Sequence, residues 1–237
     1  MALLLSALCV DALDPPGLAR FWAGVLGRET AADGVTLLPD GATGFDIRFQ
    51  PAAEPKTGRN QMHFDLTSTS LAGQQQTVAR ALGLGARHLD VGQGPDAGHV
   101  VLADPEGNEF CVIEPGNAFL DGCGFVGALS CDGSRAAGQF WSAALGWPLV
   151  WDRDEETAIQ SQRGGTKITW GGPPLPPKTG KYRLHLDLAP PPGGDQRAEV
   201  ERLLALGATP ADIGQGDVAW VVLADPDGHE LCVLPPG

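Results

Sequence analysis

Two short stretches of the sequence each alternate one histidine and one aspartate with apolar residues, once in each half of the chain. The pairs are His63 with Asp65 and His185 with Asp187. Side chains of a β-strand point to opposite faces in turn, so each stretch predicts a strand with an apolar face on a core and the polar pair on the other face. Such a pair suits a general base oriented by a carboxylate. It equally suits a hydrogen-bonded pair that only fixes strand register.

A cysteine recurs in the last predicted strand of each half, at Cys111 and Cys232. Alternation puts Cys111 on the face opposite Phe110 and Val112, so we expect it to share a cavity with the histidine of its half. A thiol and an imidazole that converge in a cleft could act as nucleophile and base, or as two metal ligands. The alternative is a small cysteine buried under the sheet.

The five cysteines are odd in number and form no CxxC pair. We match Cys9 with Cys131 and Cys111 with Cys232 in the two halves. Such cysteines are typical of buried strand residues in a reduced, cytoplasmic protein rather than of a disulfide set.

An internal repeat organises these residues. The string VVLADPEGNEFCVIEPG at 100–116 returns as VVLADPDGHELCVLPPG at 221–237. Each copy predicts a hairpin, because proline suits the second and glycine the fourth position of its Asp-Pro-acidic-Gly turn. The repeat divides the chain into two predicted domains, 1–117 and 118–237.

Each half reads as two units of one strand, one helix and three more strands. The apolar residues after Asp14 recur at helical spacing up to Leu26, where Gly27 ends the helix. Residues 3–10 are apolar without a basic flank, and we interpret them as a strand rather than a signal peptide. Four βαβββ units predict an α+β fold with two cupped mixed sheets and helices outside.

The composition of the chain excludes some classes of binding partner. The net charge is −13 and no run of lysine or arginine occurs, which argues against nucleic acid and anionic membranes. No segment reaches the roughly 18 apolar residues of a membrane span. A small molecule in a cup is therefore the expected partner. The side chains that we predict to bind it, besides Cys111 and Cys232, are Phe49, His99, Trp170 and Trp220.

The chain resembles tandem glyoxalase-like proteins of the vicinal oxygen chelate superfamily, of a type common in actinobacteria; the superfamily includes glyoxalase I, extradiol dioxygenases and bleomycin-resistance proteins. The resemblance rests on four motifs with counterparts in the second half: Phe21-Trp22, EPKTG before MHFDL, Gly85-Ala86, and DPEGNEFCV. It covers essentially every segment and implies the glyoxalase/bleomycin-resistance fold.

The resemblance also implies where a metal would bind. Metal-dependent relatives place histidine, glutamine and glutamate ligands on the first and last strands of their units. Here His63 and His185 fall on such positions, but Cys111 and Cys232 replace the glutamate, and Glu109 and Glu230 lie two residues earlier. One histidine and one cysteine per half fall short of the three or four ligands that a divalent ion takes, so we expect no metal cofactor.

Four functions stay open on these grounds. The first is a protein that binds a small, partly aromatic molecule without a metal. The second is a metal-independent lyase or isomerase with a strand histidine as general base, and the third is a divalent-metal-dependent glyoxalase or dioxygenase with atypical ligands. In the fourth, one half serves only as a packing partner. The tandem halves can supply the pairing that single-copy relatives obtain by dimerising, so a monomer or a homodimer is expected.

Overall fold

The structure is a computed structural model that describes residues 2–41, 44–94 and 97–237. In the first half its elements are β1 (Leu4–Ala12), α1 (Pro15–Leu26), β2 (Thr36–Leu37), β3 (Asp46–Pro51), β4 (Met62–Leu66), α2 (Leu71–Gly83), β5 (Arg87–His88), β6 (Val100–Ala103) and β7 (Glu109–Val112). The short 3-10 helix η1 (Ala118–Leu120) follows.

The second half repeats this order. Its elements are β8 (Val126–Cys131), α3 (Arg135–Leu145), β9 (Leu149–Arg153), β10 (Glu156–Ile159), β11 (Lys167–Trp170), β12 (Leu184–Ala189), α4 (Gln196–Ala205), β13 (Thr209–Pro210), β14 (Val221–Ala224) and β15 (Glu230–Val233). The predicted α+β fold of four repeated units is confirmed. In the described residues, however, the first unit has two strands after its helix rather than three.

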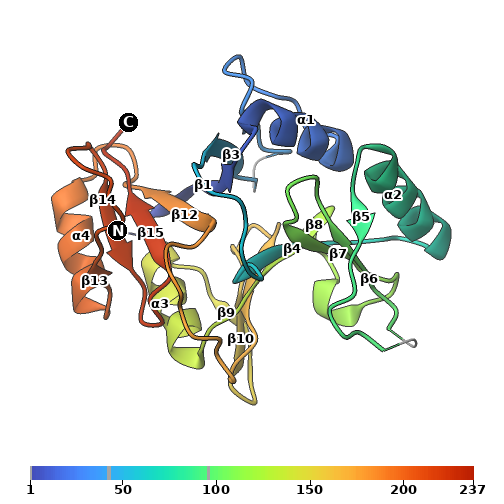
Figure 1. Cartoon of the computed structure of the whole chain (residues 1–237). Helices are drawn as coiled ribbons and strands as arrows, with labels where there is room; N and C mark the ends of the chain where they lie inside the picture. Colours follow the sequence, from blue (N-terminus) through green and yellow to red (C-terminus); the bar gives the residue numbers. More distant parts are fainter. Residues whose placement is uncertain (1, 42–43, 95–96) are drawn as a thin grey trace.

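The described strands form two mixed sheets, and each sheet takes one unit from each half of the chain. The seven-stranded sheet has the order β13-β14-β15-β12-β1-β3-β2, and the eight-stranded sheet has the order β5-β6-β7-β4-β8-β11-β10-β9. The central pairings, β1 with β12 and β4 with β8, are antiparallel and join the two halves. Figure 1 shows the result, with blue β1 beside orange β12 and teal β4 beside green β8.

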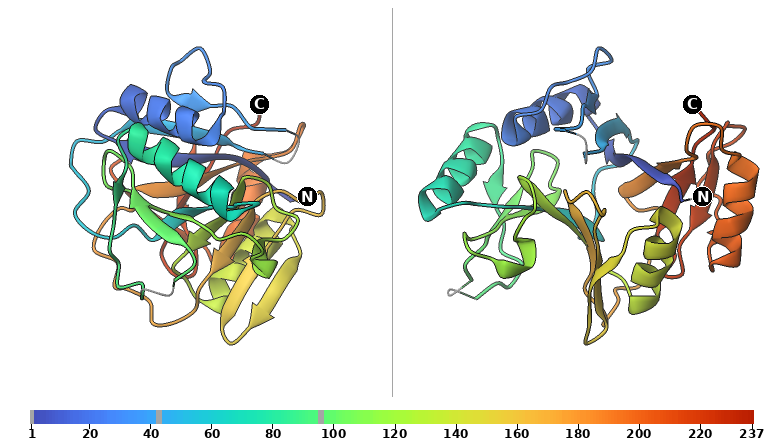
Figure 2. Two further views of the ribbon diagram at one scale, coloured as in Figure 1. Left: turned by 90° about the vertical axis from the view of Figure 1, so that its right-hand side faces the viewer. Right: turned by 180° about the vertical axis from the view of Figure 1, so that it is seen from behind.

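Local sequence explains where the helices begin and end. The side chain of Asp14 accepts a hydrogen bond from the Gly17 amide, Pro15 and Pro16 fill the first turn of α1, and Gly27 ends the helix with a φ of 68°. Figure 2 shows α1 and α2 side by side in both views, and its right-hand view shows α4 on the opposite side of the molecule. No helix in the described part of the chain is long and apolar enough to cross a membrane.

The apolar faces of both sheets meet the helices in one core. Trp22 of α1 packs against Phe64 of β4 and Phe110 of β7, with ring centroids 4.9 and 5.0 Å apart. The core contains buried residues of all four α-helices and of both sheets. The polar residues that alternate with Phe64 therefore lie on the face away from the helices.

The repeated hairpins anchor the helices as well as turning the chain. The indole of Trp22 donates to Asp104 at 3.1 Å, and that of Trp141 donates to Asp225 at 3.0 Å. Trp22 belongs to a unit of the seven-stranded sheet, whereas Asp104 belongs to a unit of the eight-stranded sheet. Each of these hydrogen bonds therefore ties the two sheets together within one half of the chain.

The two hairpin turns differ in the side chain that also contacts their buried aspartate, which is Asn108 in the first hairpin and His229 in the second. Asn108 donates its amide to Asp104 at 2.8 Å, and His229 Nδ1 lies 3.4 Å from Asp225. Burial acts to lower the pKa of His229, but the hydrogen bond and charge of Asp225 outweigh it and raise this pKa above 6.5. The His229–Asp225 pair therefore stabilises the fold fully below pH 6.5, and this stabilisation is lost as the pH rises through the raised pKa.

We expect His229→Asn, which copies the first hairpin, to remove part of the pH dependence of stability. The wild type should lose more unfolding free energy than the variant as the pH rises from 6.5 through the raised pKa of His229, because in that range the unfolded state has released the His229 proton and the folded state still holds it. Urea denaturation of both proteins at these pH values measures the difference. Parallel losses in the two proteins would contradict a titrating His229.

Candidate functional site

The two sheets each present a polar face opposite the helices, and both faces carry a histidine, an aspartate and a cysteine. We call the face of the eight-stranded sheet with His63, Asp65, Cys111, Ser130 and Thr169 the open cup. We call the corresponding face of the seven-stranded sheet, with Cys9, Arg48, His185, Asp187 and Cys232, the closed cup. Each cup joins a unit from each half of the chain.

A chain of polar groups crosses the floor of the open cup. Thr169 Oγ1 donates to Ser130 Oγ at 3.4 Å, and Ser130 Oγ donates to Asp65 Oδ2 at 2.5 Å. The other carboxylate oxygen, Oδ1, lies 3.4 Å from His63 Nε2. Burial acts to lower the pKa of His63, but its hydrogen bonds with Asp65 and Cys111 outweigh burial and raise this pKa to about 10. His63 is therefore protonated at neutral pH and presents N–H donors.

A cavity of about 480 Å³ opens over this floor. His63 and Ser130 line it, together with the aromatic rings of Phe119 and Trp151. The two rings meet edge to face with centroids 5.8 Å apart. Among the described residues, the buried indole N–H of Trp151 has no hydrogen-bond partner.

A smaller cavity of about 90 Å³ lies beside the first and contains Cys111. Arg59 and His63 line both cavities, so the two adjoin at these side chains. The guanidinium of Arg59 lies 2.6 Å from the carboxylate of Asp132. The open cup therefore offers aromatic surface, cationic N–H donors and a half-buried thiol to one ligand.

The closed cup holds the same residue types in a sealed network. The Asp187 carboxylate accepts from Cys9 Sγ at 3.1 Å and from Arg48 at 3.2 Å, and its other oxygen lies 3.4 Å from His185 Nε2. Burial acts to raise the pKa of Asp187, but these partners lower it. Burial and the nearby Asp187 carboxylate raise the pKa of Cys232 to about 12, and they raise that of Cys9 further. These side chains bond to one another, although the buried Nδ1 of His185 has no hydrogen-bond partner among the described residues, and the thiols stay protonated.

Strand register corrects the predicted match of Cys9 with Cys131. Cys9 pairs with His185 across β1 and β12, whereas Ser130 pairs with His63 across β8 and β4. Cys131 pairs with Met62 and lies in the core with the helices. Ser130 is therefore the counterpart of Cys9, because strand pairing rather than residue identity fixes the correspondence.

Four predicted ligand-binding residues lie away from the open cup's polar floor. Phe49 is 1% exposed in the helix-side core, and Trp170, 2% exposed, stacks on Trp141 of α3 although its edge borders the larger cavity. Trp220 is 40% exposed at the start of β14. His99 is half-buried before β6 and lines neither cavity of the open cup. Trp170 lies in β11 of the eight-stranded sheet, whereas Trp220 precedes β14 of the seven-stranded sheet, so the two residues do not share a cup.

Sequence reasoning missed three residues that shape the open cup, Arg59, Phe119 and Trp151. Arg59 and Phe119 lie in connecting segments, where periodicity gives no signal. Trp151 was within a predicted strand, but its neighbours do not alternate clearly between apolar and polar residues. For Phe49 and Trp170 a signal existed, because each lies two residues from an isoleucine and so shares its apolar face.

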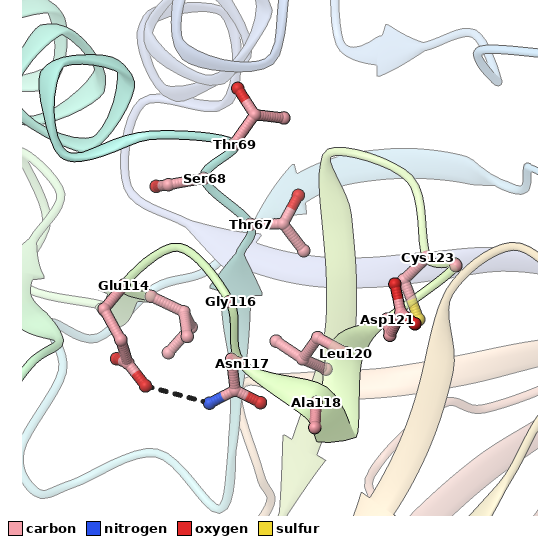
Figure 3. Close-up of a pocket in the computed structure, with 12 residues that line it drawn as sticks. Thr67, Ser68, Thr69, Glu114, Gly116, Asn117, Ala118, Leu120, Asp121 and Cys123 are labelled. Carbon is pink, nitrogen blue, oxygen red and sulfur yellow. Dashed lines mark hydrogen bonds between the residues drawn. The ribbon is translucent and has the colours of Figure 1, made fainter.

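A third cavity, of about 550 Å³, lies beyond η1 (Figure 3). Thr67, Glu114 and Cys123 line it, and the Asn117 side chain donates to Glu114 at 3.0 Å. Ala118 and Leu120 face this cavity, whereas Phe119 between them faces the open cup. The connector between the halves thus forms the wall between two cavities.

Both cups bring three possible metal donors within 4.8 Å of one another, Cys9 with His185 and Asp187, and His63 with Asp65 and Cys111. The closed cup does not suit a divalent cation, because the Arg48 guanidinium contacts the same carboxylate and the thiol donates a proton to it. The open cup offers the three protein ligands of a catalytic zinc site. An ion there would have to displace the proton of His63 and the Ser130 hydroxyl from Asp65.

Solved structures support the fold. Glyoxalase I from Zea mays is 13% identical, with a TM-score of 0.64, and the match covers 99% of this chain and 92% of that chain. A "putative dioxygenase" from Bacillus subtilis subsp. subtilis str. 168 is 14% identical, with a TM-score of 0.62, and covers 98% of this chain and 84% of that chain. At these identities the likeness shows the fold alone. No curated protein sequence matches the chain.

The sequence model of the glyoxalase-like domain family matches residues 7–113 and again residues 127–234. The two matches cover most of the chain and follow the two halves of its internal repeat. The chain therefore belongs to the glyoxalase-like domain family and carries that domain sequence twice.

Proposed function

We propose that the protein binds a small, partly aromatic organic molecule with an acidic oxygen in the open cup, without a metal. The observation that carries the proposal is the cavity of about 480 Å³, which Phe119 and Trp151 line together with His63. This volume lies in the usual range for small-molecule sites, which combine apolar walls with a few placed polar groups. The aromatic rings suit a flat ring, and the N–H donors suit its oxygens.

The charge of the donors selects the ligand. His63 is protonated at neutral pH because its pKa is raised to about 10. Arg59 also lines the cavity, where it is paired with Asp132, and Glu156 lies in the same lining, so His63 is the cation that a ligand oxygen would meet. Carboxylates, phenolates and enolates are the oxygen groups that such donors favour.

Calorimetry with simple aryl carboxylates, such as salicylate and the naphthoates, tests this proposal. We expect Trp151→Ala to weaken the tightest of these complexes at least about tenfold, because it removes an aromatic ring that lines the cavity. Trp220→Ala is the matched control, since Trp220 is an exposed indole outside the open cup. Equal dissociation constants for the two variants, or no binding across the panel, would contradict the proposal.

A metal-dependent enzyme is the second candidate, favoured by the three donors within 4.8 Å in the open cup. In that case His63, Asp65 and Cys111 would hold the ion, which would supply Lewis-acid chemistry. Elemental analysis of protein purified without chelator separates the candidates. Near-stoichiometric zinc, iron or nickel that His63→Ala removes would favour the enzyme over metal-free binding.

A further inference from the structure

Cys111 is the half-buried member of a pair of equivalent cysteines. Its counterpart Cys232 is 4% exposed in the closed cup and interacts with Asp187, and the pKa of Cys232 is raised to about 12. Cys111 instead lines the cavity of about 90 Å³ that adjoins the ligand cavity at Arg59 and His63. The same position of the fold thus carries one inert thiol and one accessible thiol.

The surroundings of Cys111 are those of a nucleophile. Its sulfur, a ring nitrogen of His63 and a carboxylate oxygen of Asp65 all lie within 4.8 Å of one another. Asp65 is held in turn by Ser130, which donates to Oδ2 at 2.5 Å. A thiol beside a histidine that a third group orients is the arrangement of an activated cysteine. The metal-free binding function does not use this thiol.

We propose that Cys111 adds covalently to an α,β-unsaturated carbonyl group that is conjugated to an aromatic ring. This proposal rests on the proposed function of the open cup. The aromatic ring occupies the side of the cavity formed by Phe119 and Trp151. The carbonyl oxygen lies at His63, which borders both cavities, and the alkene points toward Cys111. The open cup would then trap reactive aromatic enones.

The addition needs no oxidant, reductant or other reactant. Cys111 reacts as its thiolate, whose proton leaves to solvent and whose charge is stabilised by the protonated His63, which Asp65 holds in place. The sulfur lone pair forms a C–S bond at the β-carbon while the alkene π pair moves to the carbonyl oxygen as an enolate. His63 donates its proton to the enolate, which tautomerises to the ketone, and solvent returns to His63 the proton that Cys111 released, so the S–H and C=C bonds become C–S and C–H bonds.

Phenyl vinyl ketone is a suitable probe, with intact-mass measurement and peptide mapping as the readout. We expect one adduct, with the mass of one probe molecule, on Cys111. Cys123 is the matched control, because it is also half-buried but lies in the connector, where burial raises its pKa. Cys111→Ser should abolish the fast adduct, and Cys123→Ser should leave it unchanged.

His63→Gln tests the role of the histidine. General acid–base catalysis contributes about 100-fold or more, so we expect this variant to form the adduct at least about 100-fold more slowly. Propiophenone, which has the same ring and carbonyl but no alkene, shows whether the variant still binds. An unchanged adduct rate in a variant that binds propiophenone would overturn the proposal.

Two further results would count against covalent capture. Cys111 and Cys123 that react at equal rates would show that the open cup does not activate its thiol. A bound metal ion that blocks Cys111 until a chelator is added would assign the thiol to metal binding. If propiophenone and the aryl carboxylates bind but no Cys111 adduct forms, only this inference fails. If none of them binds, the proposed function fails too.

Discussion

Replacing Asp104 with alanine is expected to lower the unfolding free energy by about 3 to 5 kcal/mol, because several buried donors would lose their acceptor together. One carboxylate oxygen accepts from the Trp22 indole at 3.1 Å and from the Asn108 side chain at 2.8 Å. The other accepts from the backbone amides of Glu106 and Asn108, both at 2.9 Å. Asp104 is fully buried, so water cannot replace these bonds.

Asp90→Ala is the matched control for this change. Asp90 is also a turn aspartate, but it is exposed and accepts one bond, from the Gly92 amide at 2.8 Å. We expect it to cost less than about 0.5 kcal/mol, as surface substitutions usually do. Urea denaturation measures both variants. Similar midpoints for Asp104→Ala and Asp90→Ala would show that the hairpin anchor contributes little.

The hairpin shows what the sequence could and could not predict. Its repeat predicted two turns and two strand pairs, and the structure confirms them. The turn signal depends on neighbouring residues, so it can be recognised locally. The role of Asp104 as acceptor for Trp22 joins residues that are 82 positions apart, and no local pattern encodes that contact.

The candidate site also has features that local sequence could predict and features that it could not. Alternation predicted that His63 and Asp65 share the face opposite Phe64, because that rule needs only one strand. It could not predict that the Arg48 guanidinium closes one cup or that Phe119 forms a wall of the other, since both come from segments distant in sequence. The roles of His63, Asp65, His185 and Asp187 in catalysis stay predictions.

The pairing of units was also beyond local reasoning. A strand pattern identifies a unit but not its neighbour, and every unit here has the same pattern. In the structure, β1 finds its partner β12 and β4 finds its partner β8 across the two halves. The proposed domains 1–117 and 118–237 therefore describe the sequence repeat, and whether each folds alone is a separate, testable question.

The two halves, expressed separately as residues 1–117 and 118–237, are expected not to form stable monomers. The fragment 1–117 would leave β1 and β4 as sheet edges with one side unpaired, because their partners on that side, β12 and β8, belong to the other half, whereas β3 and β7 remain. Unpaired strand edges favour self-association. We therefore expect each fragment alone to aggregate or to form a homodimer by pairing β1 and β4 with a second copy, and a mixture of the two to give a 1:1 complex. Size-exclusion chromatography with light scattering distinguishes these species.

The connector allows a control with the intact fold. Asp121, Gly122 and Gly124 are exposed, so a protease site inserted there should be accepted and cut without disturbing either sheet. The two fragments of the cut protein should elute together, because every bond between β1 and β12 and between β4 and β8 remains. A monomeric fragment 1–117 that unfolds cooperatively would contradict this expectation and show that each half is a folding domain. If the two fragments of the cut protein separate, the Trp–Asp hydrogen bonds within each half contribute more to stability than the strand pairing between the halves.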